Sequence, residues 1–353
     1  MKHRDDIKAA PGRALGVWGL LAALTLQVTG CARLTDWQLA RYRDDQLAAS
    51  YRYALGEEYI DAGGVRICYQ ELGAGDNVLI LPGLGTSADF WRLNISVLAE
   101  RFHVLAMDLP GFGKSGKPDA SYELSWMCEK IISFLDAKGI ERTHVIGGSL
   151  GGHLALMMTL DHPDRVGKLV MTGSCGAWKT PGPLLDMIFK WFWNDATVTD
   201  HIRRNWKHIY TRLFQTHNPM TQEILRYQMA IRADHDRFKQ EGRASSRALK
   251  SIFYSSCRDR LAEVTKPVLL IFGAHDFVHP PRDGEFFHRH LPDSRLLIVA
   301  DAAHEVMVDQ PDIFNREVMR FLGRSEDVSV GDSEKTPINL EADADTAGRT
   351  SMD

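Results

Sequence analysis

The sequence predicts an α/β fold in which a mostly parallel sheet is covered by helices on both faces. Three observations lead to this prediction: short apolar runs, helical patterns between them, and one long block without strand-like sequence. Strands buried on both faces of a parallel sheet are apolar along their length, and their alternation with helices is typical of α/β domains. With 353 residues, 44% hydrophobic and 25% charged, the chain can form one main domain with an insertion.

The first expected element is a β-hairpin. Residues 58–73 alternate around a Gly-Gly pair, as hairpin strands do. Apolar runs then predict buried strands at residues 78–81, 104–107, 145–147, 169–172, 268–272 and 296–299. Helical patterns lie between these runs, as in residues 125–139 and 150–163, and the second pattern stops at Pro163.

The alternation of strands and helices stops between residues 176 and 262. That block carries only helical patterns, at residues 183–195, 198–214, 219–240 and 247–261. A helical block inside an α/β domain is an insertion, and such an insertion can cover a site as a lid. We therefore expect a core in two parts, residues 56–175 and 263–323, with a helical cap at residues 176–262 between them.

A candidate nucleophile, Ser149, lies among four glycines in residues 145–156, VIGGSLGGHLAL. The pattern G-x-S-x-G is formed by Gly147, Ser149 and Gly151 between a predicted strand and a predicted helix. A sharp turn there would push the serine hydroxyl out of the sheet, at a strain of about 1–3 kcal/mol. Glycines at its flanks remove the clashes of such a turn. The N-terminus of the helix also presents free N–H groups toward a developing anion.

An acid and a histidine follow Ser149 in the order that such a serine needs. Asp276 ends the strand-like sequence PVLLIFGAHD, and His304 follows it by 28 residues, after a further strand. Both lie at carboxyl ends of predicted strands, where open α/β sheets bind ligands. We expect His304 to act as general base toward Ser149, and Asp276 to orient and stabilise the imidazole.

Other side chains compete for these roles. Asp301 and Asp309 are alternative acids, although neither ends a strand, and the loop at residues 173–176, GSCG, holds no carboxylate. His275 and His279 are too close to the proposed acid in sequence to be its partner. We interpret them as loop residues that can contact substrate.

In this order, the motifs resemble the α/β-hydrolase superfamily over residues 56–323. The sequence LPGLGTSADFW, residues 81–91, is similar to the loop that supplies one oxyanion N–H, and DLPGFGKS, residues 108–115, resembles the loop after the next strand. The family usually has His-Gly where this chain has Pro82-Gly83. The resemblance implies the α/β-hydrolase fold, and oxyanion donors at the N–H groups of Leu84 and Leu150.

A serine nucleophile implies an acyl-enzyme, and thus an ester, thioester or amide substrate, or acyl transfer. It argues against resemblance to haloalkane dehalogenases and epoxide hydrolases, which use an aspartate. The carbon–carbon hydrolases of aromatic degradation usually carry Asn before the serine and Trp after the histidine, where this chain has Gly148 and Glu305. We predict a small-molecule carboxylic ester as substrate and expect no cofactor or metal. C–C bond hydrolysis, acyl transfer and a catalytically silent envelope binding protein are the alternatives.

The predicted cap is rich in aromatic and basic residues. Its aromatic residues include two candidate substrate contacts, Trp178 and Trp191, but packing in the core of the cap is the simpler interpretation. From residue 190 to 260 there are fourteen Lys/Arg and seven Asp/Glu. This excess could favour anionic substrates or lipids, although solvated helix faces explain it more simply. His288 and His290, in a polar helix, are expected to be a surface pair rather than metal ligands.

The N-terminus resembles a bacterial lipoprotein signal. A charged stretch precedes the apolar residues 14–30, and VTGC ends at Cys31. We expect residues 1–30 to be a signal peptide, Cys31 to carry lipid, and residues 31–55 to tether the domain to a membrane of the cell envelope. In a Gram-negative cell, Ala32 would direct the protein to the periplasmic face of the outer membrane. An uncleaved membrane anchor is the alternative.

Charge and cysteine content limit the remaining classes. A net charge of −4 argues against a nucleic-acid partner. Residues 324–353 hold eight acidic and three basic residues, which predicts a disordered tail. The four cysteines other than Cys31 have no spacing typical of a zinc site or a disulfide framework, so we expect buried free thiols. The sequence does not determine the oligomeric state.

Overall fold

A computed structural model describes residues 56–216, 219–323 and 338–340. The described strands form one sheet in the order β1-β2-β4-β3-β5-β6-β7-β8-β9. The pairs β1–β2 and β2–β4 are antiparallel, and all the other pairs are parallel. The strands are β1 (Glu57–Asp61), β2 (Arg66–Leu72), β3 (Asn77–Leu81), β4 (His103–Met107), β5 (Thr143–Gly148), β6 (Val166–Thr172), β7 (Val268–Gly273), β8 (Ser294–Val299) and β9 (Ile338–Leu340). The predicted hairpin and all six predicted buried strands are confirmed.

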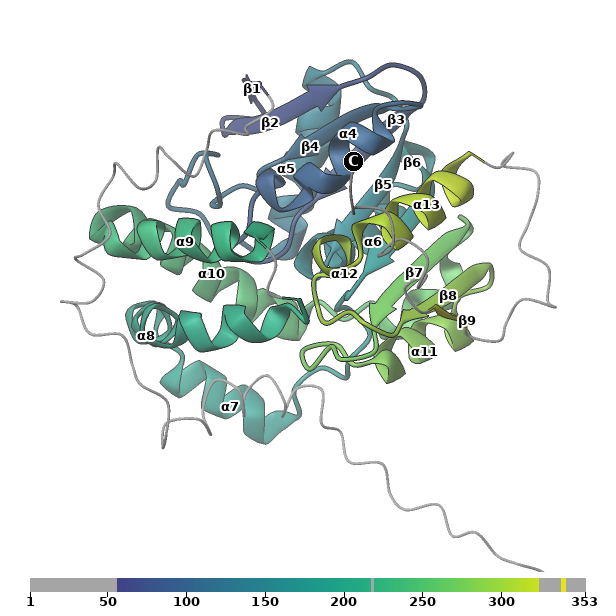
Figure 1. The fold of residues 1–353 in the computed structure, drawn as a ribbon. Helices are drawn as coiled ribbons and strands as arrows, with labels where there is room; N and C mark the ends of the chain where they lie inside the picture. Colours follow the sequence, from purple (N-terminus) through teal and green to yellow (C-terminus); the bar gives the residue numbers. More distant parts are fainter. Residues whose placement is uncertain (1–55, 217–218, 324–337, 341–353) are drawn as a thin grey trace, which may run out of the picture.

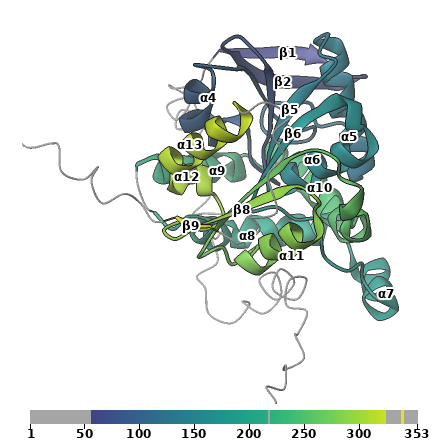
Figure 2. The same ribbon diagram turned by 90° about the vertical axis from the view of Figure 1, so that its right-hand side faces the viewer.

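Helices cover both faces of this sheet, as predicted (Figure 2). One face carries α5 (Leu124–Ala137), α6 (Leu150–Asp161) and α11 (Pro281–His290). The other carries α4 (Arg92–Leu98), α12 (Val306–Asp309) and α13 (Pro311–Leu322). A separate hydrophobic cluster lies between the sheet and the helices on each face. Because side chains alternate along a strand, successive strand residues are buried in different clusters.

Strand β3 shows why the central strands are continuously apolar. Val78 and Ile80 point into the cluster beneath α4 and α13, whereas Leu79 and Leu81 point into the cluster beneath α5 and α6. All four side chains are fully buried. Side chains alternate between the two faces of a strand, so a strand covered twice has no polar face.

Four helices lie between β6 and β7, in the segment expected to be a cap (Figure 1). They are α7 (Pro183–Phe192), α8 (Asp195–Leu213), α9 (Pro219–Ala233) and α10 (His235–Tyr254). Helices α8, α9 and α10 pack against one another. Figure 2 shows α7 apart from these three, at one side of the molecule.

The helix bounds in the cap and one strand near the C-terminus differ from the sequence prediction. The pattern at residues 219–240 is divided by Asp234, whose side chain accepts a hydrogen bond from the backbone N–H of Arg237 (3.0 Å) and starts α10. The short strand β9 lies in the segment expected to be a disordered tail, and pairs with β8. Its three residues, Ile-Asn-Leu, are too few to give a recognisable pattern.

Other parts of the prediction fall outside the described residues. These are the signal peptide, Cys31, the tether up to residue 55, and the tail except for β9. Among the described helices, none combines the length and apolar content that a membrane crossing requires. The remaining cysteines, Cys68, Cys128, Cys175 and Cys257, are buried free thiols, as predicted.

Candidate active site

Ser149 occupies a strained turn between β5 and α6. Its backbone has φ +51° and ψ −114°, a conformation that residues with a side chain rarely adopt. Strain of this kind costs about 1–3 kcal/mol and is held by the surrounding structure. Glycines permit the close approach: a Cβ on Gly147 would clash with the backbone of Gly151, and a Cβ on Gly151 would clash with the carbonyl of Leu81. The turn thus forms where the glycine pattern indicated.

His304 and Asp276 form a buried hydrogen-bonded pair. Nδ1 of His304 lies 2.8 Å from Oδ2 of Asp276, and the two residues are only 5% and 3% exposed. The other carboxylate oxygen of Asp276 accepts hydrogen bonds from the backbone N–H groups of Val278 (2.8 Å) and His279 (2.9 Å). Both oxygens are therefore occupied, and the carboxylate is held in one orientation. In the neutral imidazole, a proton on Nδ1 leaves Nε2 of His304 available as an acceptor.

The turn at Ser149 lies beside this pair. The backbone N–H of Ser149 donates to the carbonyl of Thr172 (3.0 Å), the last residue of β6. At the next residue, Gly173, a Cβ would lie 3.1 Å from Nδ1 of His304 and 3.2 Å from Oδ2 of Asp276. The three residues expected to form a triad therefore gather at the carboxyl ends of neighbouring parallel strands.

The segments that carry the two expected oxyanion donors lie next to Ser149. Leu150 is the first residue of α6, and the first N–H groups of a helix have no acceptor within the helix. Leu84 lies in a turn in which the N–H and the hydroxyl of Thr86 both donate to the carbonyl of Gly83 (3.3 and 2.9 Å). A Cβ on Gly83 would lie 3.4 Å from Cβ of Ser149. Pro82, which replaces the usual histidine, is buried within this loop.

The charge state of His304 depends on two neighbouring carboxyl groups. Burial lowers its pKa, but the charge and hydrogen bond of Asp276, together with the charge of Glu305, outweigh burial and raise the pKa to about 9. Glu305 is itself buried, and burial raises its pKa to about 7. The free site therefore favours the imidazolium form of His304 near neutral pH.

His279 lies closer to the pair than its interpretation as a loop residue suggests. It is 3% exposed, and its ring centroid lies 5.6 Å from that of His304 and 5.4 Å from that of Trp178. Trp178 is partly buried and donates from Nε1 to the carbonyl of Ile252 (3.2 Å). The ring of His279 therefore neighbours both the imidazole of His304 and the indole of Trp178. By contrast, His275 is exposed.

Two sequence interpretations were wrong: the packing of Trp191 in the core of the cap and the position of His288 at the surface. Trp191, expected in the core of the cap, in a substrate pocket or at a membrane, is 80% exposed on α7, which rules out packing in the core of the cap. His288, expected at the surface, is buried and shares a hydrogen bond with the hydroxyl of Ser294 (2.9 Å). Among the alternative acids, Asp301 is exposed, whereas Asp309 is buried and accepts hydrogen bonds from Ala303 and from the start of the α8–α9 connection.

The described residues contain no cluster of three or more His, Cys, Asp or Glu side chains suited to hold a metal ion.

Comparisons with known proteins agree with the fold. A family model of the α/β hydrolase fold matches residues 76–311. The dihydrolipoyllysine-residue acetyltransferase component of an acetoin cleaving system from Cupriavidus necator is 28% identical over 89% of this chain and 82% of its own length. A 2-hydroxy-6-oxo-6-(2'-aminophenyl)hexa-2,4-dienoic acid hydrolase from Metapseudomonas resinovorans is 27% identical over 81% of this chain and 97% of its own. The crystal structure of a bacterial membrane phospholipase A aligns with a TM-score of 0.64 at 25% identity, covering 87% of this chain and 96% of that one. The family model spans more than half of the chain, which therefore belongs to the α/β hydrolase fold family.

Proposed function

We propose that this chain is a serine hydrolase that cleaves carboxylic esters through an acyl-enzyme on Ser149. The observation that carries this proposal is the buried pair of Asp276 and His304 beside a serine in a strained turn. A strained nucleophile next to an oriented imidazole has no evident role in stability, because the strain itself costs free energy. An imidazole oriented by a carboxylate activates a serine for acyl transfer when it reaches the hydroxyl, which supports this proposal.

The proposed reaction has two halves, acylation and deacylation, in which the same groups act. The Oγ of Ser149 attacks the ester carbonyl carbon while Nε2 of His304 takes the hydroxyl proton. The N–H groups of Leu84 and Leu150 stabilise the negative oxygen of the tetrahedral intermediate. His304 then returns the proton to the leaving alcohol, which leaves an acyl group on Ser149. Water repeats the sequence, releases the acid and restores the serine.

The comparisons support more than one acyl chemistry. A phospholipase A acts on a carboxylic ester, which favours the proposed substrate class. The dienoic acid hydrolase cleaves a carbon–carbon bond, and this reaction is the second candidate. The positions that flank the site argue for the ester, because Gly148 and Glu305 stand where the carbon–carbon hydrolases usually have Asn and Trp.

We further propose that the enzyme is exported and anchored to the cell envelope through lipid on Cys31. This rests on the sequence of residues 1–31, which lie outside the described part of the structure. Metabolic labelling with an alkyne fatty acid would test it. Label on the full chain that is lost in Cys31→Ser supports the anchor, and an unlabelled mature protein would contradict it.

The first test of catalysis is a fluorophosphonate probe, followed by mass spectrometric mapping of the label. We expect label on Ser149 that is abolished by Ser149→Ala and strongly reduced by His304→Ala. Circular dichroism of each variant controls for folding. The labelled enzyme is then assayed with p-nitrophenyl esters and with a vinylogous dienone. Hydrolysis of the dienone alone would overturn the ester assignment, and a folded but unreactive wild-type protein would favour a silent binding protein.

A further inference from the structure

Two cap helices donate hydrogen bonds to one carbonyl in the proposed oxyanion loop. The phenol of Tyr210, on α8, donates to the carbonyl of Gly85 (3.0 Å), and the amide of Gln228, on α9, donates to the same oxygen (3.3 Å). Tyr210 is 6% exposed and Gln228 is 1% exposed. Because both donors are buried, water cannot readily replace either bond.

The Gly85 carbonyl is close to the proposed catalytic donor in the chain. Gly85 follows Leu84 directly and has φ +71°, a conformation that favours glycine. The same turn is closed from the other side by Thr86, which donates to the carbonyl of Gly83. The peptide that carries the Leu84 N–H contains the Gly83 carbonyl, which Thr86 bonds within the turn, and the cap bonds the carbonyl of Gly85, the next residue. The two sets of hydrogen bonds thus lie on either side of Leu84 in the chain.

The cap also holds the loop that carries His304. The side chain of Asp309 accepts from the backbone N–H groups of Gln215 and Thr216 (2.9 Å each), just after α8, and from the N–H of Ala303 (2.9 Å). The N–H of Glu305 donates to the carbonyl of Leu213, the last residue of α8. The end of α8 is thus bonded directly to Glu305, and the residues just after it are linked to Ala303 through the side chain of Asp309.

We propose that Tyr210 and Gln228 are positioning residues that hold the oxyanion turn in its active geometry. The inference rests on the proposed function, because it takes Leu84 as an oxyanion donor. It gives the cap a role beyond covering the substrate: α8 and α9 would complete the site by fixing the loops that carry the donor and the base. Displacement of a catalytic group by about 1 Å can lower a rate by about 10²-fold.

The variants Tyr210→Phe and Gln228→Met test this inference in the full chain. Tyr210→Phe keeps the ring and removes only the hydroxyl. We expect kcat for a p-nitrophenyl ester to fall about tenfold while KM stays within about twofold, because the lost stabilisation belongs to the transition state. Affinity for a trifluoromethyl ketone, which forms an oxyanion on Ser149, should fall in parallel. Tyr122→Phe is the matched control, since its buried phenol donates to the carbonyl of Pro118 (2.7 Å).

A second measurement does not depend on activity. Backbone hydrogen exchange in a peptide that covers residues 82–87 should accelerate in Tyr210→Phe and in Gln228→Met, but not in Tyr122→Phe. Unchanged exchange and an unchanged kcat, relative to this control, would overturn the inference. If the wild-type protein does not react with fluorophosphonate, the proposed function fails, and the exchange data still decide whether the cap positions the turn.

Discussion

The Oδ2 atom of Asp276 lies 2.8 Å from the Nδ1 atom of His304, although 28 residues separate the two in the chain. The sheet topology explains this proximity. β7 and β8 are adjacent and parallel, with Gly273 paired to Val299, and each residue follows the carboxyl end of its strand. Parallel strands present their carboxyl ends at one edge, so the loops that follow them meet there.

Asp276→Asn should reduce kcat of the proposed reaction by roughly 10⁴-fold, with little effect on folding. The amide can still accept the hydrogen bonds from Val278 and His279 through its oxygen. Its nitrogen would then face His304 as a donor and favour the wrong tautomer. Steady-state ester hydrolysis measures the effect. Asp301→Asn, at an exposed alternative acid, is the control and should retain wild-type kcat; equal losses in both variants would contradict the assignment.

The pH dependence of kcat/KM should rise through an unusually high pKa. His304 must be neutral to accept the proton of Ser149, and its pKa in the free site is raised to about 9. The value of kcat/KM should therefore increase with pH up to about 9. With an ordinary histidine pKa of about 6.5, it would reach its plateau at a lower pH. An ester without ionisable groups gives the profile. A plateau reached below pH 7 would contradict the expectation.

Glu305→Gln should shift this profile to lower pH. The negative charge of Glu305 contributes to the raised pKa of His304, so its removal lowers that pKa and increases the neutral fraction of the imidazole at pH 7. We expect kcat/KM at pH 7 to increase about threefold to tenfold. Glu285→Gln makes the same charge change on the exposed surface of α11 and should leave the profile in place. Identical profiles for both variants would mean that Glu305 does not act on His304.

The buried strands and the order of the site residues were predictable because both depend on local sequence. Apolar runs mark β3 to β8 directly, and the glycines around Ser149 mark the turn. The contacts that cross between core and cap were not predictable. The hydrogen bonds from Tyr210 and Gln228 to Gly85 join residues more than one hundred positions apart, and no local sequence pattern predicts them.

Tertiary contacts also decide the roles of single side chains. His279 was interpreted as a loop residue that can contact substrate, and the fold buries it beside His304. Asp309 was an alternative acid, and the fold instead gives it hydrogen bonds from the cap. Trp191 is the opposite case, because its size predicts burial but α7 presents it to solvent. The burial and contacts of these side chains depend on tertiary structure, whereas the positions of the buried strands follow from local apolar sequence.

Gly151→Ala should destabilise the protein substantially. A Cβ at this position would clash with the carbonyl groups of Leu81 and Pro82, which belong to backbone and cannot move aside as a flexible side chain would. Overpacking of this kind costs about 1–3 kcal/mol or more of the free energy of unfolding. Urea denaturation measures the loss. Gly182→Ala is the control, because no atom lies within 4 Å of the added Cβ; a difference smaller than 0.5 kcal/mol, roughly the scale of ordinary surface changes, would contradict the argument.

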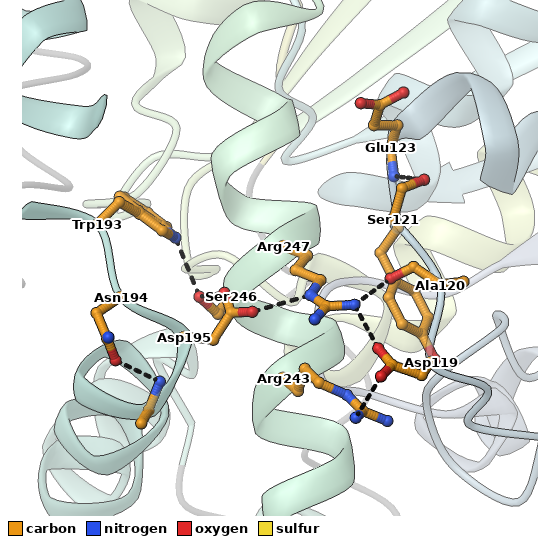
Figure 3. A network of polar contacts seen from close by, with 12 residues as sticks. Asp119, Ala120, Ser121, Glu123, Trp193, Asn194, Asp195, Arg243, Ser246 and Arg247 are labelled. Carbon is orange, nitrogen blue, oxygen red and sulfur yellow. Dashed lines mark hydrogen bonds and ion pairs between the residues drawn. The ribbon is translucent and has the colours of Figure 1, made fainter. Parts of the chain in front are cut away.

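Arg247 bonds the cap to the core and to the start of α8 (Figure 3). From α10, its guanidinium pairs with Asp119 (2.7 Å) in a core loop and with Asp195 (2.8 Å) at the beginning of α8. Arg243 adds a second contact to Asp119 (3.4 Å), and Ser246 a second contact to Asp195 (2.8 Å). Isolated surface ion pairs contribute little, but this arginine is shared by three segments.

Arg247→Gln should therefore loosen the cap without unfolding the sheet. We expect backbone hydrogen exchange in α10 and at the start of α8 to accelerate about twofold to fivefold, with exchange in the central strands unchanged. Added salt should produce the same change in the wild-type protein, because it screens these pairs. Arg204→Gln is the matched control: Arg204 pairs with Asp200 on its own helix and cannot join cap to core. Equal acceleration in both variants would mean that exchange in α10 responds to the loss of any cap charge, and not to the loss of the contact between Arg247 and Asp119.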